Sequence, residues 1–293
     1  MIYVSSECIQ ARYIVENVKE LASSGFRRIE LSGGTSYYNS YLGDLLKLKK
    51  EHKLEYLVHN YFPPPEEGFV LNLASLSEKV RNRSVDFCKK AIEVAAVLGA
   101  GYYSVHAGFY FDPEITELGK VIKPRKLYPA GDSIQVFIDN FKALKQYALA
   151  HRIKLYLENN VVNLKSFQSL NKMIPAMLLT FEDARELGRK IDFNLLLDVG
   201  HLKVTAQTLG LDFQKQFSGL FKISDYLHLS DNNGLMDEHG LIFDDSMIYK
   251  MFLGHDLTQK TFVLETHGEI NDVKKSYVLI SNLLTQKTKQ PPG

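Results

Sequence analysis

Residues 154–158 read KLYLE and residues 194–198 read NLLLD, so each of these short apolar runs ends on a carboxylate. Continuous apolar runs of this length are typical of strands that are buried on both faces in a parallel sheet. Parallel strands point their carboxyl ends the same way, so we expect the polar groups that close such runs to gather on one face. The residues at or just beyond such ends are His59, His106, Glu158, Asp198, His201, His228, Asp237, His239 and Glu265.

The apolar runs alternate with segments of helical periodicity along nearly the whole chain. The expected strands are 2–5, 28–32, 54–59, 102–106, 154–158, 194–198, 225–230 and 261–265. The expected helices are 10–24, 40–52, 78–98, 133–151, 180–190 and 271–287. This order predicts an α/β fold, a (β/α)8 TIM barrel, with an open doubly wound sheet as the alternative. The barrel is favoured because closure brings distant strand ends around one small opening.

Composition limits the classes of function. The chain has 293 residues, of which 45% are hydrophobic, and we predict a single domain over 1–287 with a disordered tail at 288–293. With 35 Lys and Arg against 34 Asp and Glu, the net charge of +1 gives no global reason to expect nucleic acid or a membrane as partner. Two isolated cysteines and the lack of a signal-peptide pattern or a long apolar span predict a cytoplasmic protein.

Four polar residues close the fifth to eighth predicted strands: Glu158, Asp198, His228 and Glu265. Together they could hold one divalent cation and leave room for substrate oxygens. Alternatively, each could cap a strand or pair with a lysine. Four unpaired polar groups that point into a barrel would be costly, which favours the cation. Glu30, at the end of the second strand, is predicted to support this site by hydrogen bonding.

Five further residues extend the predicted site beyond one ion. His59 and His106 close adjacent strands, and Asp237 and His239 lie in the loop after the seventh strand. His201 follows Asp198 in a D-x-x-H step, where Gly200 is expected to let the backbone turn sharply into a loop. Nine ligands are too many for a single four- to six-coordinate metal, so the full set implies a cluster of two or three metals. Because the quartet alone could hold one ion, we expect one to three divalent ions per chain, zinc or manganese.

The order LVHNYF (57–62), SVHAG (104–108), LYLENN (155–160), LLLDVGHL (195–202), LHLSDNNGLMDEHG (227–240) and VLETHG (263–268) resembles the xylose isomerase-like TIM-barrel superfamily. The resemblance runs from about residue 26 to 280. That superfamily includes sugar-phosphate isomerases and epimerases and the endonuclease IV class of apurinic-site nucleases. The resemblance implies that Glu158, Asp198, His228 and Glu265 match the single-metal set of the epimerases, whose two glutamates also act as acid and base. It also implies that His59, His106, His201, Asp237 and His239 match the additional ligands of the trinuclear zinc cluster of endonuclease IV.

The favoured function is therefore a metal-dependent isomerase or epimerase of a sugar, polyol or sugar phosphate. Glu158 and Glu265 would transfer the proton next to a metal-polarised carbonyl, and His201 would orient a substrate hydroxyl. The alternative is a zinc-dependent phosphodiesterase at apurinic sites, the only interpretation in which nucleic acid is a partner. A metabolite-binding barrel without catalysis is a third interpretation, and the oligomeric state is left open.

The loops that follow the predicted strands bear on this choice. The loop at 61–72, YFPPPEEGFVLN, is acidic, although Tyr61 and Phe62 could wedge into a base stack. The loop at 33–44, GGTSYYNSYLGD, has aromatic residues but no arginine. The basic cluster Lys120, Lys123, Arg125 and Lys126 suits one phosphorylated small molecule better than a duplex, and a solvated loop remains the simpler interpretation.

Overall fold

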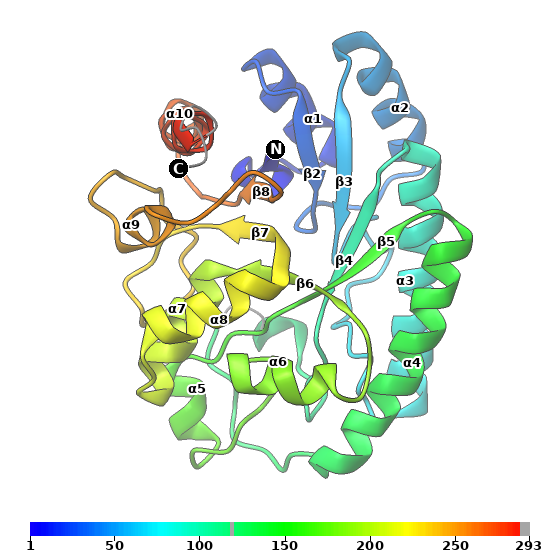
Figure 1. Cartoon of the computed structure of the whole chain (residues 1–293). Helices are drawn as coiled ribbons and strands as arrows, with labels where there is room; N and C mark the ends of the chain where they lie inside the picture. Colours follow the sequence, from blue (N-terminus) through cyan, green and yellow to red (C-terminus); the bar gives the residue numbers. More distant parts are fainter. Residues whose placement is uncertain (118–119, 288–293) are drawn as a thin grey trace.

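A computed structural model describes residues 1–117 and 120–287 and shows a closed barrel of eight parallel strands (Figure 1). Each strand pairs with its neighbours in the chain, and β8 closes the barrel against β1. The strands are β1 (Ile2–Ser5), β2 (Arg28–Leu31), β3 (Glu55–His59), β4 (Tyr102–His106), β5 (Lys154–Glu158), β6 (Asn194–Asp198), β7 (Ser224–Leu229) and β8 (Thr261–Leu264). The (β/α)8 TIM barrel is confirmed. The predicted tail at 288–293 lies outside the described residues, and the assignment of 1–287 to one domain stays a prediction.

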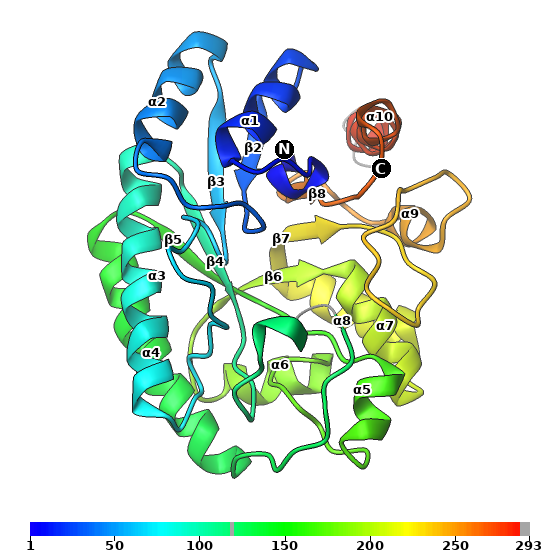
Figure 2. The same ribbon diagram turned by 180° about the vertical axis from the view of Figure 1, so that it is seen from behind.

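Helices surround the barrel, with α2, α3 and α4 along one side and α7 and α8 on the other (Figures 1 and 2). The helices are α1 (Ile14–Ser23), α2 (Tyr41–His52), α3 (Glu78–Leu98), α4 (Ala130–Ala150), α5 (Leu164–Ser169), α6 (Phe181–Gly188), α7 (Val199–Leu209), α8 (Phe213–Ile223), α9 (Met247–Phe252) and α10 (Ile270–Lys287), with short 3-10 turns at η1 (Ser6–Cys8) and η2 (Ile115–Glu117). The sequence analysis did not identify α5, α7, α8 and α9. Within the described ranges, no helix combines the length and the apolar character that crossing a membrane requires.

The prediction of a loop after Asp198 was wrong, because helix α7 begins directly at Val199. Asp198 caps this helix, and its Oδ1 atom accepts a hydrogen bond of 2.7 Å from the backbone N–H of His201. Gly200 is needed for a close approach rather than for a turn, since a Cβ atom there would lie 2.7 Å from Ser230 Oγ. The first turn of α7 therefore places His201 at the C-terminal end of the barrel.

The barrel interior contains an apolar layer, and the candidate ligands lie directly beyond it. The apolar layer consists of Tyr3, Leu57, Tyr156, Leu196, Tyr226 and Val263. Side chains two residues apart in a strand point to the same face. Each residue of the layer is thus followed, two positions on, by an inward polar residue. These polar residues are Ser5, His59, Glu158, Asp198, His228 and Glu265, and all six are buried.

Leu196→Ala should test this packing, because Leu196 is fully buried in the apolar layer. The substitution leaves a cavity inside the barrel, and we expect a loss of about 2–5 kcal/mol in the free energy of unfolding. Urea unfolding followed by circular dichroism measures the change. Leu149→Ala is the matched control, since Leu149 on α4 is 68% exposed and should change the free energy by no more than about 0.5 kcal/mol. Equal effects of the two substitutions would contradict the assignment of Leu196 to the interior.

Candidate metal centre

All nine residues singled out from the sequence gather at the C-terminal end of the barrel. They come from the last residues of β3 to β6, from the second-to-last residue of β7, from the residue after β8, from the first turn of α7 and from the loop after β7. Every one of them lies within 4 Å of another member of the set. The structure therefore brings together residues that are spread over two hundred positions of the chain, and their role as ligands remains a prediction.

Glu158 lies at the centre of this arrangement and is almost fully buried. Its Oε2 atom lies 3.4 Å from His59 Nε2 and 3.3 Å from His106 Nδ1. Its Oε1 atom faces the other side and lies 3.8 Å from His228 Nδ1. Because its two oxygens face different groups of potential ligands, Glu158 is suited to bridge two cations.

Three members of the predicted epimerase-type quartet place ligand atoms close together, and the fourth lies beside one of them. Glu158, Asp198 and His228 each offer one ligand atom, and these three atoms lie within 4.8 Å of one another. The fourth member, Glu265, has its Oε2 atom 3.0 Å from His228 Nδ1. The other oxygen of Glu265 accepts a hydrogen bond of 3.2 Å from the Ser5 hydroxyl, which fixes the orientation of the carboxylate.

A third group of ligands forms where the loop after β7 returns to the barrel. Asp237 Oδ2 lies 3.1 Å from His201 Nε2 and 3.1 Å from His239 Nε2. His239 has a φ angle of 49°, in the left-handed region, and this turn lets two residues so close in sequence point at a common place. Asp231, from the same sequence motif, instead pairs with Lys203 at 2.6 Å.

Most of the histidines are held by a contact to one ring nitrogen, which leaves the other nitrogen facing the ligand cluster. His59 Nδ1 contacts Ser104 Oγ at 2.9 Å. His201 Nδ1 lies 3.0 Å from the carbonyl oxygen of Asn159, and His239 Nδ1 lies 3.2 Å from that of Glu265. Such contacts to the distal nitrogen orient the histidine ligands of metal sites and fix their tautomer.

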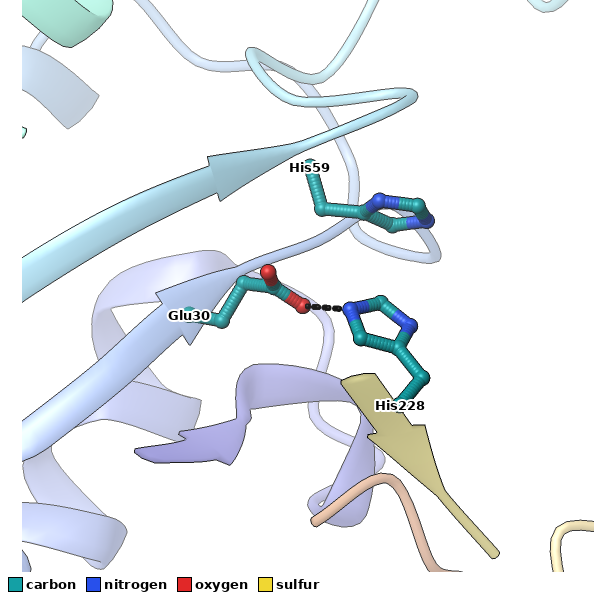
Figure 3. Close-up of side chains that lie close together, drawn as sticks. All are labelled: Glu30, His59 and His228. Atoms are coloured by element: carbon teal, nitrogen blue, oxygen red, sulfur yellow. Dashed lines mark ion pairs between the residues drawn. The ribbon is translucent and has the colours of Figure 1, made fainter. Parts of the chain in front are cut away.

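Glu30 provides the corresponding contact for His228 (Figure 3). Its Oε1 atom lies 2.9 Å from His228 Nε2, and both side chains are fully buried. Glu30 pairs in register with Leu57 rather than His59, so it lies deeper in the barrel than the other ligands. The sequence indicated a supporting role for Glu30, but its partner became evident only from the closed barrel. Glu30, His59 and His228 also offer three ligand atoms within 4.8 Å of one another.

Burial and charge divide the site into a neutral half and a charged half. Burial lowers the pKa of His106 to about 3 and that of His59 well below its usual value, while it raises the pKa of Glu158 well above its usual range. Around Asp237 the charges outweigh burial. Burial lowers the pKa of His239, but the Asp237 carboxylate raises it to about 10. The charges of His201 and His239 in turn hold the pKa of Asp237 well below its usual value.

The site fits a divalent cation because several buried nitrogen and oxygen atoms that could bind a metal have no hydrogen-bond partner. Within the described part of the chain, these atoms are Glu158 Oε2, Asp198 Oδ2, His106 Nδ1, His228 Nδ1 and Asp237 Oδ1. Each such atom costs on the order of 1–3 kcal/mol if it stays unsatisfied. A set of imidazole nitrogens and carboxylate oxygens suits zinc or manganese.

A cavity of about 820 Å³ opens above these ligands. Its floor includes His59, His106, Glu158 and Glu265, and its walls come largely from the long loops at 60–77 and 107–129. Aromatic and aliphatic side chains dominate the walls: Tyr37, Tyr61, Phe69, Phe109, Ile115, Ile122, Val161, Val162 and Met236. The cavity thus offers polar ligands at its base and apolar surface above them, as is common in small-molecule sites.

The structure gives less support for the binding of a DNA duplex than the sequence does. Within the basic cluster, Lys123 pairs with Glu114 at 2.8 Å, and Arg125 pairs with Glu117. Only Lys120 of that cluster lines the cavity. Phe62 is fully buried and cannot wedge into a base stack, while the Tyr61 hydroxyl accepts a hydrogen bond from the backbone N–H of Leu71.

Comparison with known proteins gives the same fold. A family model described as xylose isomerase-like TIM barrel matches residues 18–276. An uncharacterized protein of Methanocaldococcus jannaschii is 26% identical over 241 residues, which cover 80% of this chain and 72% of that protein. A D-tagatose 3-epimerase-like protein superposes with a TM-score of 0.70 at 20% identity, covering 98% and 99% of the two chains. Endonuclease IV from Thermus thermophilus superposes with a TM-score of 0.61 at 15% identity, covering 97% and 99%.

Glu30→Gln should weaken metal binding, because glutamine keeps the size of the side chain but removes the charge that orients His228. We expect the affinity for Mn²⁺ to fall about 10- to 100-fold. Isothermal titration of the metal-free protein with MnCl2 measures the change. The control is Glu20→Gln on the exposed face of α1, which should bind as the unaltered protein does. Unchanged affinity in Glu30→Gln would show that the contact to His228 has no part in holding the metal.

Metal binding should release protons. At pH 7 the raised pKa of His239, about 10, keeps this imidazole protonated, and it must lose its proton to coordinate a cation. Burial also raises the pKa of Glu158, which acts in the same direction. Affinity should therefore increase from pH 6 to pH 8, with about one or more protons released for each ion bound. Titration with MnCl2 in two buffers of different ionisation enthalpy counts the protons. Heats that are independent of the buffer, together with affinity that is independent of pH, would contradict this expectation.

Proposed function

Because this chain belongs to the xylose isomerase-like TIM-barrel family, we propose that it is a metal-dependent isomerase or epimerase of a sugar or polyol. The observation that carries the proposal is the placement of two buried carboxylates, Glu158 and Glu265, beside the same nitrogen of His228 at the floor of the cavity. An isomerase needs one group to remove a proton from carbon and a second to return it. The similarity to a D-tagatose 3-epimerase-like protein supports this choice of reaction.

The quartet Glu158, Asp198, His228 and Glu265 would hold the cation. When bound there, a divalent cation polarises a substrate carbonyl and acidifies the neighbouring C–H bond. Of Glu158 and Glu265, one takes the proton from carbon and the other returns it to the opposite face or to the adjacent carbon. The Ser5 hydroxyl keeps Glu265 in place. His201, which the Asn159 carbonyl oxygen contacts at Nδ1, would orient a substrate hydroxyl.

The size and chemistry of the cavity support a small neutral substrate. A volume of about 820 Å³ is large enough to hold a single sugar. The aromatic walls can pack against the C–H faces of a sugar, while the ligands at the floor meet its oxygens. Water is thereby partly excluded from the carbon that loses its proton.

A second candidate, a zinc-dependent phosphodiesterase at apurinic sites, is favoured by one specific observation. The five residues beyond the quartet form two further groups of ligands, His59 and His106 on Glu158 Oε2, and His201 and His239 on Asp237. An epimerase with one metal requires only the quartet as ligands, not these five residues. We place this candidate second because the paired cations of the basic cluster and the buried Phe62 leave little to hold a duplex.

Glu158→Gln and Glu265→Gln should each abolish proton transfer, because an amide cannot take or return the proton. We expect turnover to fall about 10²- to 10⁴-fold with an unchanged circular dichroism spectrum. The protein loaded with Mn²⁺ is incubated in D2O with D-tagatose, D-psicose or L-ribulose, and NMR follows the replacement of C–H by C–D. Glu20→Gln again serves as the control. Exchange within tenfold of the unaltered rate in both glutamine variants would refute this mechanism.

Metal content and an abasic-site duplex separate the two candidates. Activity on ketoses with one Mn²⁺ per chain supports the isomerase. Nicking of the duplex by the zinc-loaded protein, with about three zinc ions per chain, would instead establish the phosphodiesterase. Salt dependence of duplex binding is a further criterion, since contacts to several phosphates make affinity fall steeply with salt.

A further inference from the structure

Glu7 is a carboxylate of the cavity that the proposed chemistry does not use. It lies in η1, directly after β1, and its side chain lines the cavity together with Gly33 and Gly34 from the loop after β2. Cβ atoms built on these two glycines would lie 3.8 and 3.6 Å from Glu7 Oε1, so the carboxylate packs closely against this turn. The backbone N–H of Glu7 donates to Ser5 Oγ at 3.2 Å, which links its position to the residue that holds Glu265.

Among the buried and partly buried carboxylates that line the cavity, Glu7 differs because its oxygens have no protein partner within the described ranges. Glu30, Glu158, Asp237 and Glu265 each lie within 3.5 Å of a histidine nitrogen. For Glu7, no hydrogen bond or ion pair of the side chain is found among residues 1–117 and 120–287. It also belongs to none of the groups of three ligand atoms within 4.8 Å that these residues form. A partly buried carboxylate in this situation is free to bind a ligand that enters the cavity.

The surroundings of Glu7 indicate what that partner is. Burial raises the pKa of Glu7 to about 7, and the nearby Glu265 carboxylate contributes to this rise, whereas His239 and His228 act in the opposite direction. A carboxyl group of the cavity without a protein partner can accept hydrogen bonds from hydroxyl groups of a ligand. A phosphate placed beside the Glu7 and Glu265 carboxylates would in contrast be repelled.

We propose that Glu7 binds hydroxyl groups of the substrate on the β1–β2 side of the cavity and thereby selects a sugar or polyol that carries no phosphate at that end. This inference rests on the proposed isomerase or epimerase function and extends it to the substrate class. Lys120, the one lysine or arginine among the described residues that line the cavity, comes from the loop between β4 and α4. Glu7 acts on binding rather than on proton transfer, so its removal should raise KM and leave kcat nearly unchanged.

The test uses the full chain loaded with Mn²⁺ and three variants, Glu7→Ala, Glu7→Gln and the exposed control Glu20→Gln. D-tagatose is the probe, with its 1-phosphate and 6-phosphate as charged analogues. Saturation-transfer NMR on protein loaded with diamagnetic Zn²⁺ gives the dissociation constants, and the D2O exchange assay gives KM and kcat. Metal content per chain is measured for every variant.

We expect Glu7→Ala to weaken D-tagatose binding about tenfold or more, with kcat within threefold and metal content unchanged. Glu7→Gln keeps a hydrogen-bonding group and loses the charge. It should retain part of the affinity for D-tagatose and bind at least one of the two phosphates more tightly than the unaltered protein does. Glu20→Gln should match the unaltered protein throughout.

Three results would overturn the inference. Binding of D-tagatose by Glu7→Ala within twofold of the unaltered protein would show that Glu7 does not contact the substrate, while the proposed function stands. Loss of metal in both Glu7 variants would assign the residue to the metal centre instead. If the unaltered protein binds and exchanges none of D-tagatose, D-psicose and L-ribulose, the proposed function fails and the inference fails with it.

Discussion

Closure of the eight-stranded barrel is the constraint on which the rest of this structure depends. The strands are parallel and each pairs with its chain neighbours, so their carboxyl ends surround one small opening. Side-chain alternation then repeats one rule around the barrel: an apolar residue points inward, and a polar residue two positions later lies above it. Tyr156 and Glu158 on β5 are one example, and Tyr226 and His228 on β7 are another.

The polar layer built in this way is electrostatically demanding. It holds buried carboxylates and imidazoles at separations near 3 Å, and burial alone would neutralise all of them. The site meets this cost in two ways: the Oε2 atom of Glu158 faces His59 and His106, whose pKa values burial lowers, whereas Asp237 carries its charge between His201 and His239. Both arrangements suit exchange of protons for a cation. Contacts to Glu30, Ser104 and backbone carbonyls fix how the imidazoles face it.

The cavity above the ligands narrows the choice among the chemistries of this family. Its aromatic walls and its volume favour a small polyhydroxylated molecule. The loop after β4, in which the sequence showed a basic cluster, has two of its cations paired with Glu114 and Glu117. The cavity surface thus suits the small-molecule substrate that we propose, whereas the full set of nine predicted ligands is larger than one metal ion needs.

Much of the fold and of the ligand cluster could be predicted because both follow from local patterns. Apolar runs that end on histidine or carboxylate depend only on neighbouring residues, and β4, β5 and β6 begin and end where the sequence predicted. The helix after Asp198 was missed because its start depends on a cap by the Asp198 side chain and on the approach of Ser230 to Gly200. The sequence did not single out Glu7, because its proposed role depends on a carboxylate without a protein partner, and only the packed structure shows this.

The sequence by itself determined the barrel and the identity of nine residues around its opening, and it predicted that they bind divalent cations. Only the tertiary structure decided that Glu158 lies between two groups of ligands, that Glu30 holds His228, and that Phe62 is buried. The physical reason is that alternation and hydrophobicity act between residues close in the chain. Distances between side chains on different strands, in contrast, depend on barrel closure and on how the loops pack above it.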